Sequence, residues 1–123
     1  MTRSRGHRRA AERRGKAAEL ICLWHLRLRG YRILARRYKT PAGEIDLIAR
    51  RGDTLAAIEV KARADFDAAT EAVTRRQQRR ITRAIAHFLG GRPDLATLAA
   101  RFDVMLVAPR RWPRHLVDAW RDE

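Results

Sequence analysis

The sequence has little cysteine and few acidic residues, and it lacks any long apolar run. Its single cysteine, Cys22, excludes an intramolecular disulfide framework and a cysteine-based zinc cluster. No stretch approaches the roughly 18 apolar residues that a membrane-spanning helix needs, so no membrane segment is expected. Acidic residues number 14 against 28 basic ones, which gives a formal net charge of +14. A polyanionic partner follows from that excess, and nucleic acid fits it better than a membrane surface.

The 123 residues suffice for one domain, and an apolar content of 46% is enough for one packed core. Residues 1–8 are basic and lack apolar periodicity, so they are predicted to form a flexible tail before a single domain over residues 9–123. No apolar signal-peptide region follows this tail, which favours a cytoplasmic protein.

Apolar periodicity predicts two helices, over residues 9–29 and 71–89. In the first helix, the expected buried stripe consists of Ala17, Leu20, Ile21, Trp24 and Leu28. Strand patterns occupy residues 31–39, 44–50, 54–63, 101–107 and 115–120. The predicted order is therefore helix, three strands, helix, two strands, in an α/β domain.

Turn residues at 41–43 and 51–53 join the first three strands closely, which favours an antiparallel meander. In the second strand, alternation places Ile45, Leu47 and Ala49 on one face and Asp46 on the other. In the third, Glu59 and Lys61 share a face about 7 Å apart along the strand.

Asp46 and the Glu59-Val60-Lys61 segment are the residues most able to carry chemistry. If the meander forms, Asp46 and Glu59 converge on adjacent strands. Two carboxylates supply hard oxygen ligands for Mg²⁺, and a nearby lysine can orient a water and offset charge on a phosphorane. This combination suits phosphodiester hydrolysis.

A plainer interpretation stays open for each residue, because Glu-x-Lys on a strand is common by chance. Glu59 and Lys61 would then form a solvated pair worth less than ~1 kcal/mol, and Asp46 would face outward near a turn. Three features favour function: the acids lie among apolar residues, they lie together in a basic protein, and Lys61 is one of only three lysines beside 25 arginines.

At this point the sequence resembles a known family, the YraN-like bacterial proteins. The resemblance spans about residues 12–107 and rests on motif order and spacing. Its motifs are Gly30-Tyr31-Arg32-Ile33-Leu34, Thr40 to Ala49, Gly52-Asp53-Thr54-Leu55, Glu59-Val60-Lys61-Ala62-Arg63, Glu71-Ala72-Val73-Thr74, Gln78-Arg79-Arg80 and Arg101-Phe102-Asp103-Val104. This family is regarded as a branch of the PD-(D/E)xK nuclease superfamily, similar to archaeal Holliday junction resolvases. The resemblance implies a restriction-endonuclease-like core, a mixed β-sheet flanked by helices.

By resemblance, Asp46 and Glu59 are the acidic metal ligands, the Val60 carbonyl completes the metal shell, and Lys61 is the catalytic lysine. Glu19 on the first helix and Gln78 on the second match residues that assist the site. Two departures from the family pattern are Ala18, where a glycine is usual, and Arg75, where a proline is usual. Neither departure removes a metal ligand.

Five arginines on the second predicted helix are expected to contact phosphates: Arg75, Arg76, Arg79, Arg80 and Arg83. The four histidines share no metal-ligand spacing, and Cys22 is expected to be a small core residue. For Trp24, Trp112 and Trp120, packing in the core or at an edge is a more common role than stacking on nucleic-acid bases, which is the alternative.

The leading hypothesis is a Mg²⁺- or Mn²⁺-dependent DNA endonuclease that acts on branched or structured DNA. The alternative is a catalytically silent nucleic-acid-binding module of the same fold, and a third is a small basic partner of the ribosome or nucleoid. Resolvases of similar fold act as dimers because two opposed strands must be cut, so the resemblance allows a homodimer, although the sequence itself shows no interface.

Overall fold

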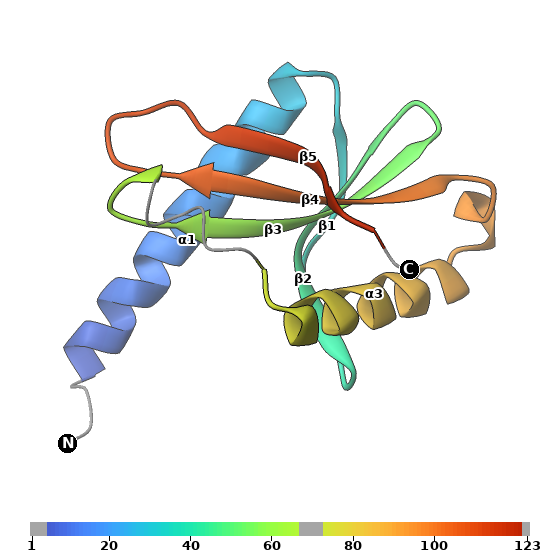
Figure 1. Ribbon diagram of the computed structural model, residues 1–123, viewed down its shortest axis with the longest axis horizontal. Coiled ribbons are helices and arrows are strands. Elements are labelled where there is room, and N and C mark those ends of the chain that lie inside the picture. The colour runs from blue at the N-terminus through green and yellow to red at the C-terminus, as the bar shows by residue number, and fades with distance from the viewer. Residues whose placement is uncertain (1–4, 67–72, 122–123) are drawn as a thin grey trace.

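A five-stranded sheet between two helices forms the protein (Figure 1). The structure is a computed structural model that describes residues 5–66 and 73–121. The elements in chain order are α1 (Arg5–Leu28), β1 (Arg32–Thr40), β2 (Gly43–Arg51), β3 (Thr54–Ala62), α3 (Arg75–Gly90), a 3-10 turn η1 (Pro93–Leu95), β4 (Ala99–Val107) and β5 (Arg114–Trp120). The predicted element order and α/β class are confirmed.

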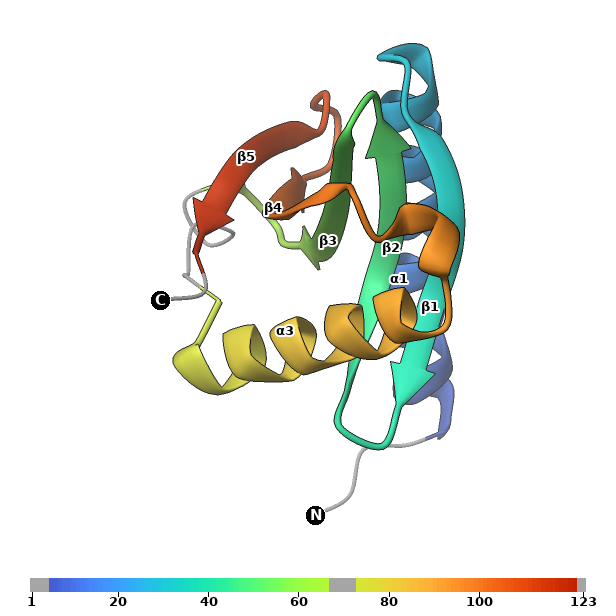
Figure 2. The same ribbon diagram turned by 90° about the vertical axis from the view of Figure 1, so that its right-hand side faces the viewer.

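The sheet is mixed, and its strands lie in chain order from β1 to β5. Strands β3 and β4 are parallel and every other neighbouring pair is antiparallel, so the predicted meander of β1, β2 and β3 is confirmed. Helix α1 covers one face and α3 the other, as Figure 2 shows. This arrangement is consistent with a restriction-endonuclease-like fold.

The two tight turns of the meander follow from their residues. At the β1–β2 turn, the Thr40 hydroxyl accepts hydrogen bonds from the backbone N–H groups of Ala42 and Gly43, at 3.1 and 3.0 Å. At the β2–β3 turn, Gly52 has a φ of 59°, a conformation that glycine adopts without steric cost. These short turns fix the register that brings β2 beside β3.

Helix α3 begins at Arg75, later than the predicted start, and residues 71 and 72 lie outside the described residues. Thr74 caps it: its side chain accepts from the N–H of Gln77, and the Gln77 side chain accepts from the N–H of Thr74. The helix packs so closely on β2 that a Cβ added to Gly43 would clash with the Arg80 carbonyl oxygen.

Helix α1 buries a different stripe from the predicted one. Ala18, Cys22 and Leu26 are at most 3% exposed, whereas Trp24 is 55% and Leu28 81% exposed. The prediction chose the larger side chains, but the smaller Ala18 and Cys22 pack against the sheet. The prediction that Cys22 is a core residue is confirmed.

The helix begins at Arg5, so it includes residues 5–8, which the sequence analysis assigned to the tail; residues 1–4 lie outside the described part. None of the helices in the described part is long and apolar enough to span a membrane.

Candidate active site

A cleft of about 1070 Å³ opens beside the carboxyl ends of the parallel strands β3 and β4. Figure 1 shows both strands pointing toward the same side, where the β4–β5 turn also lies. Residues of α1 complete the lining. Four of the predicted site residues line this one cleft: Glu19, Asp46, Glu59 and Val60.

Asp46 lies where β2 and β3 part. Their pairing runs from Arg51 opposite Thr54 to Leu47 opposite Ile58 and extends no further in the register. Beyond it, Oδ2 of Asp46 accepts a hydrogen bond of 2.7 Å from the backbone N–H of Val60. A side-chain carboxylate thus takes the place of a main-chain acceptor on the neighbouring strand.

The same divergence explains an error in the predicted alternation of β2. Ile45 was expected on the face of Leu47 and Ala49, but it belongs to the core beneath α3, whereas they belong to the core beneath α1. Because β2 is no longer paired with β3 at Asp46, its backbone is free to turn Ile45 toward α3.

The Val60 carbonyl is directed toward the same side as Asp46. In an extended strand, the N–H and C=O of one residue point the same way, which lets opposed residues exchange two hydrogen bonds. Since the N–H of Val60 bonds to Asp46, its carbonyl oxygen opens toward β2 as well. The backbone therefore offers a third oxygen beside the two carboxylates.

Asp46 and Glu59 interact directly, and the pKa of each is raised. Burial is the main cause for both. The charges of Glu19 and Glu44 add to the rise at Asp46, and the charge of Asp46 adds to the rise at Glu59, whose pKa reaches about 7. Lys61 opposes this shift, with its Nζ 3.6 Å from Oε1 of Glu59. The structure thus brings the predicted lysine to Glu59, one of the two predicted acids.

Glu19 reaches the cleft from α1 and is only 9% exposed. Its Oε2 accepts a hydrogen bond of 2.7 Å from Nε of Arg37 on β1. Its negative charge contributes to the raised pKa of Asp46, which places it near the acid pair. The ion pair with Arg37 holds Glu19 at the margin of the site.

The donor set fits a Mg²⁺ or Mn²⁺ ion held by few protein ligands. In the described part of the chain, no three His, Cys, Asp or Glu residues lie close enough together to hold a metal. Magnesium, however, usually keeps several waters and uses one or two carboxylates. Asp46 and Glu59 supply these carboxylates, and Val60 offers its carbonyl. A cation would stabilise two adjacent, partly buried carboxylates.

The predicted residues on α3 lie elsewhere. Gln78 donates to the Val73 carbonyl at 2.9 Å and is not among the described residues that line the cleft. The five arginines are all exposed, on the helix that covers the opposite face of the sheet from α1: Arg75, Arg76, Arg79, Arg80 and Arg83. The structure does not bring these six residues to the carboxylates.

The cleft contains cations and an aromatic residue that the sequence analysis did not assign to it. Arg63 follows β3, and Arg110, Arg111 and Trp112 form the β4–β5 turn. The sequence does contain a basic and aromatic segment between Pro109 and Pro113. This segment predicts a turn, but it does not predict which other residues the turn lies beside.

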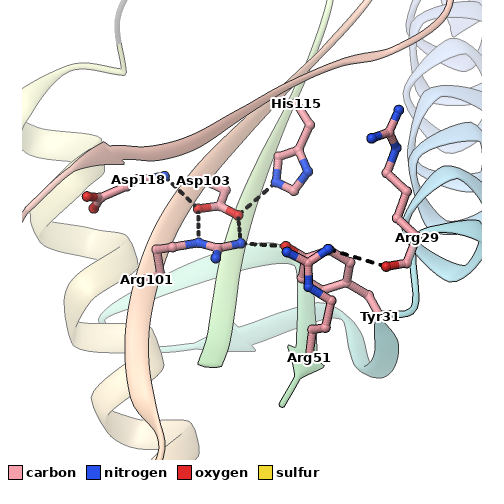
Figure 3. Close-up of polar contacts among 7 residues, drawn as sticks. All are labelled: Arg29, Tyr31, Arg51, Arg101, Asp103, His115 and Asp118. Carbon is pink, nitrogen blue, oxygen red and sulfur yellow. Dashed lines mark hydrogen bonds and ion pairs between the residues drawn. The ribbon is translucent and has the colours of Figure 1, made fainter. Parts of the chain in front are cut away.

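A second polar cluster, drawn in Figure 3, centres on the fully buried Asp103 of β4. Its carboxylate accepts two hydrogen bonds from Arg101, one from His115 and one from the backbone N–H of Asp118. Burial alone would raise the pKa of Asp103, but these donors outweigh it and lower the pKa to about 2. Arg101 also donates to the Tyr31 hydroxyl at 2.6 Å, so the cluster joins β4 and β5 to the start of β1.

Comparisons with known proteins agree on one family. The model of a family described as "Uncharacterised protein family UPF0102" matches residues 18–107. A UPF0102 protein of Parvibaculum lavamentivorans is 62% identical over 112 residues, covering 91% of this chain and 84% of that protein. A UPF0102 protein of Paramagnetospirillum magneticum is 57% identical, with 96% and 94% covered, and one of Brucella canis is 52% identical, with 94% and 92% covered. These names state no activity.

Proposed function

We propose that this chain, which belongs to the UPF0102 family within the restriction-endonuclease-like superfamily, is a metal-dependent endonuclease that hydrolyses phosphodiester bonds in DNA. The observation that carries the proposal is that Asp46 and Glu59 line one cleft of a strongly basic protein, with Lys61 paired to Glu59. Paired carboxylates whose pKa values are raised are typical of functional sites.

In this proposal Asp46, Glu59 and the Val60 carbonyl hold the metal. A bound Mg²⁺ polarises the scissile phosphate and lowers the pKa of a coordinated water. The hydrogen bond from the Val60 N–H fixes one oxygen of Asp46 and so orients the carboxylate. Glu59 positions the Lys61 ammonium, which orients the attacking water and offsets the negative charge that develops on the phosphate.

Arginines supply the substrate affinity. Arg63, Arg110 and Arg111 line the same cleft as the carboxylates, where they would hold phosphates of the bound DNA. The exposed arginines of α3 add positive charge on the face of the sheet opposite α1, where they steer DNA toward the protein. In this proposal the α3 arginines attract DNA at long range, and the arginines of the cleft position its phosphates near the carboxylates.

The experiment is a cleavage assay on linear and branched DNA with Mg²⁺ or Mn²⁺. We expect cleavage by the wild type and its loss in Asp46→Asn, Glu59→Gln and Lys61→Ala, with DNA binding retained in each. Asp53→Asn is the matched control, because this exposed acid lies in the turn at the other end of the β2–β3 hairpin. It should cleave like the wild type.

Binding without cleavage under either metal would contradict the hydrolase and favour the silent binding module. Cleavage that survives Asp46→Asn and Glu59→Gln would also contradict it, because the activity would then come from elsewhere. Activity on branched DNA beyond that on linear DNA would extend the proposal to structured substrates, and cutting of paired strands would call for two copies of the chain.

A further inference from the structure

Trp112 is 81% exposed at the edge of the cleft that contains the carboxylates. Core or edge packing is the more common role for a tryptophan, as Trp120 shows by stacking on Phe102 with ring centroids 5.2 Å apart. Trp112 instead presents its indole to solvent, and its neighbours Arg110 and Arg111 are exposed as well. A large aromatic side chain left outside the core beside a polar site indicates a binding role.

The turn that carries Trp112 is anchored on both sides of the indole. The guanidinium groups of Arg111 and Arg114 lie over the Phe66 ring, 5.5 and 4.7 Å from its centroid. Phe66 follows β3, so these contacts join the β4–β5 turn to the strand that carries Glu59 and Lys61. These contacts hold the turn, and with it the backbone of Trp112, beside the end of β3.

We propose that Trp112 is a stacking platform for an unpaired nucleobase of DNA bound in the cleft. The substrate class would then be DNA in which a single-stranded segment adjoins the scissile phosphate, as in a flap, an overhang or a branch. This inference rests on the proposed function, because it places DNA at the carboxylates.

The chemistry of the turn selects an unpaired base over a duplex. Bases inside a duplex already stack on one another, whereas an unpaired base has a free face that an exposed indole can cover. Arg110 and Arg111 bring positive charge next to the indole, where the backbone phosphates of the same strand would lie. An aromatic surface flanked by arginines is a common arrangement for binding single strands.

The test compares the affinities of two DNAs, a blunt duplex and the same duplex with a single-stranded flap. Binding is measured by fluorescence anisotropy with EDTA present, so that no cleavage interferes. We expect Trp112→Ala to weaken flap binding about tenfold, equivalent to about 1.4 kcal/mol, and to leave blunt-duplex binding unchanged. Trp112→Phe keeps an aromatic face and should retain most of the flap preference.

Trp24→Ala is the matched control, because Trp24 is also exposed but lies outside the described lining of the cleft. It should change neither affinity. A flap carrying 2-aminopurine gives a second readout: its fluorescence should be quenched by the wild type and recover with Trp112→Ala. Quenching by the wild type alone already reports stacking of the base. The test therefore remains informative even if Trp112→Ala folds poorly.

Equal weakening of both DNAs by Trp112→Ala, no weakening of either, or the same loss with Trp24→Ala would overturn the stacking proposal. The two proposals fail separately. Quenching by a wild type that never cleaves would overturn the hydrolase alone, whereas cleavage that needs Asp46 but is indifferent to Trp112 would overturn the platform alone.

Discussion

The pKa of Glu59 predicts how the stability of the metal-free protein depends on pH. Burial first, and the Asp46 carboxylate second, raise this pKa from 4.5 to about 7. The folded protein therefore holds the proton of Glu59 more tightly than the unfolded chain does. The resulting stabilisation is fully present below about pH 4.5 and is lost as the pH rises through 7.

The size of the effect follows from the shift. One pKa unit corresponds to about 1.36 kcal/mol, so the loss between pH 4.5 and pH 8 is about 3 kcal/mol. The Glu59 side chain is only 18% exposed, so solvent screens this interaction little. For a small domain of marginal stability, such a loss is a large part of the free energy of unfolding.

The measurement is urea denaturation at several pH values from 5 to 8 in EDTA, for the wild type and Glu59→Gln. All other ionisable groups are common to both proteins, so the difference between the two pH profiles reports on Glu59. We expect the wild type to lose stability relative to the variant as the pH rises. Asp53→Asn, which alters an exposed acid, should follow the wild type.

Parallel pH profiles for wild type and Glu59→Gln would refute the reasoning, because Glu59 would then titrate alike in both states. Magnesium offers a second check at pH 8, above the pKa of about 7 of Glu59. A hundredfold excess over Kd should stabilise the wild type by about 2.7 kcal/mol, and Glu59→Gln much less.

Three further predictions concern the rest of the fold. Asp103→Asn leaves the guanidinium of Arg101 without its carboxylate and should lower the free energy of unfolding by about 3–5 kcal/mol in urea denaturation. Because the pKa of Asp103 is lowered to about 2, the wild type should also lose about 2 kcal/mol of stability as the pH falls from 4 to 2, a loss absent from the variant. Gly43→Ala should push α3 off β2 and cost about 1–3 kcal/mol in the same assay, with Gly52→Asn as a milder comparison. Burial raises the pKa of Cys22 to about 12, so iodoacetamide should label the unfolded chain and spare the folded one; rapid labelling of the native protein would contradict this burial.

Local patterns predicted most of the elements and the carboxylate pair. The turn at Gly52 and the alternation of side chains in β3 depend only on residues that are close in sequence. A hairpin with such a short turn must place Asp46 near Glu59. Spacing alone was enough here, because an antiparallel meander has only one simple register once its turns are known.

Features that depend on distant contacts were not predictable in this way. Which stripe of α1 is buried depends on the shape of the sheet face, and small side chains such as Cys22 allow a closer approach than Trp24. The position of the α3 arginines relative to the cleft depends on which face the crossover helix covers. The place of Trp112 depends on β4 being parallel to β3, which brings its following turn to the carboxyl end of β3.

The contrast between the two buried acid sites supports a cation at the cleft. Asp103 is a structural carboxylate: donors from three residues surround it, and its pKa is lowered to about 2. Glu59 is largely buried, with 18% of its side chain exposed, yet its pKa stays raised to about 7 although Lys61 lies 3.6 Å away. Hydrogen-bond donors thus fully offset the cost of burying the charge of Asp103, whereas the cost of burying the charge of Glu59, beside Asp46, is offset only in part. A structural role would favour the first arrangement, whereas binding a divalent cation requires the second, because ligands already saturated by hydrogen bonds cannot coordinate a metal.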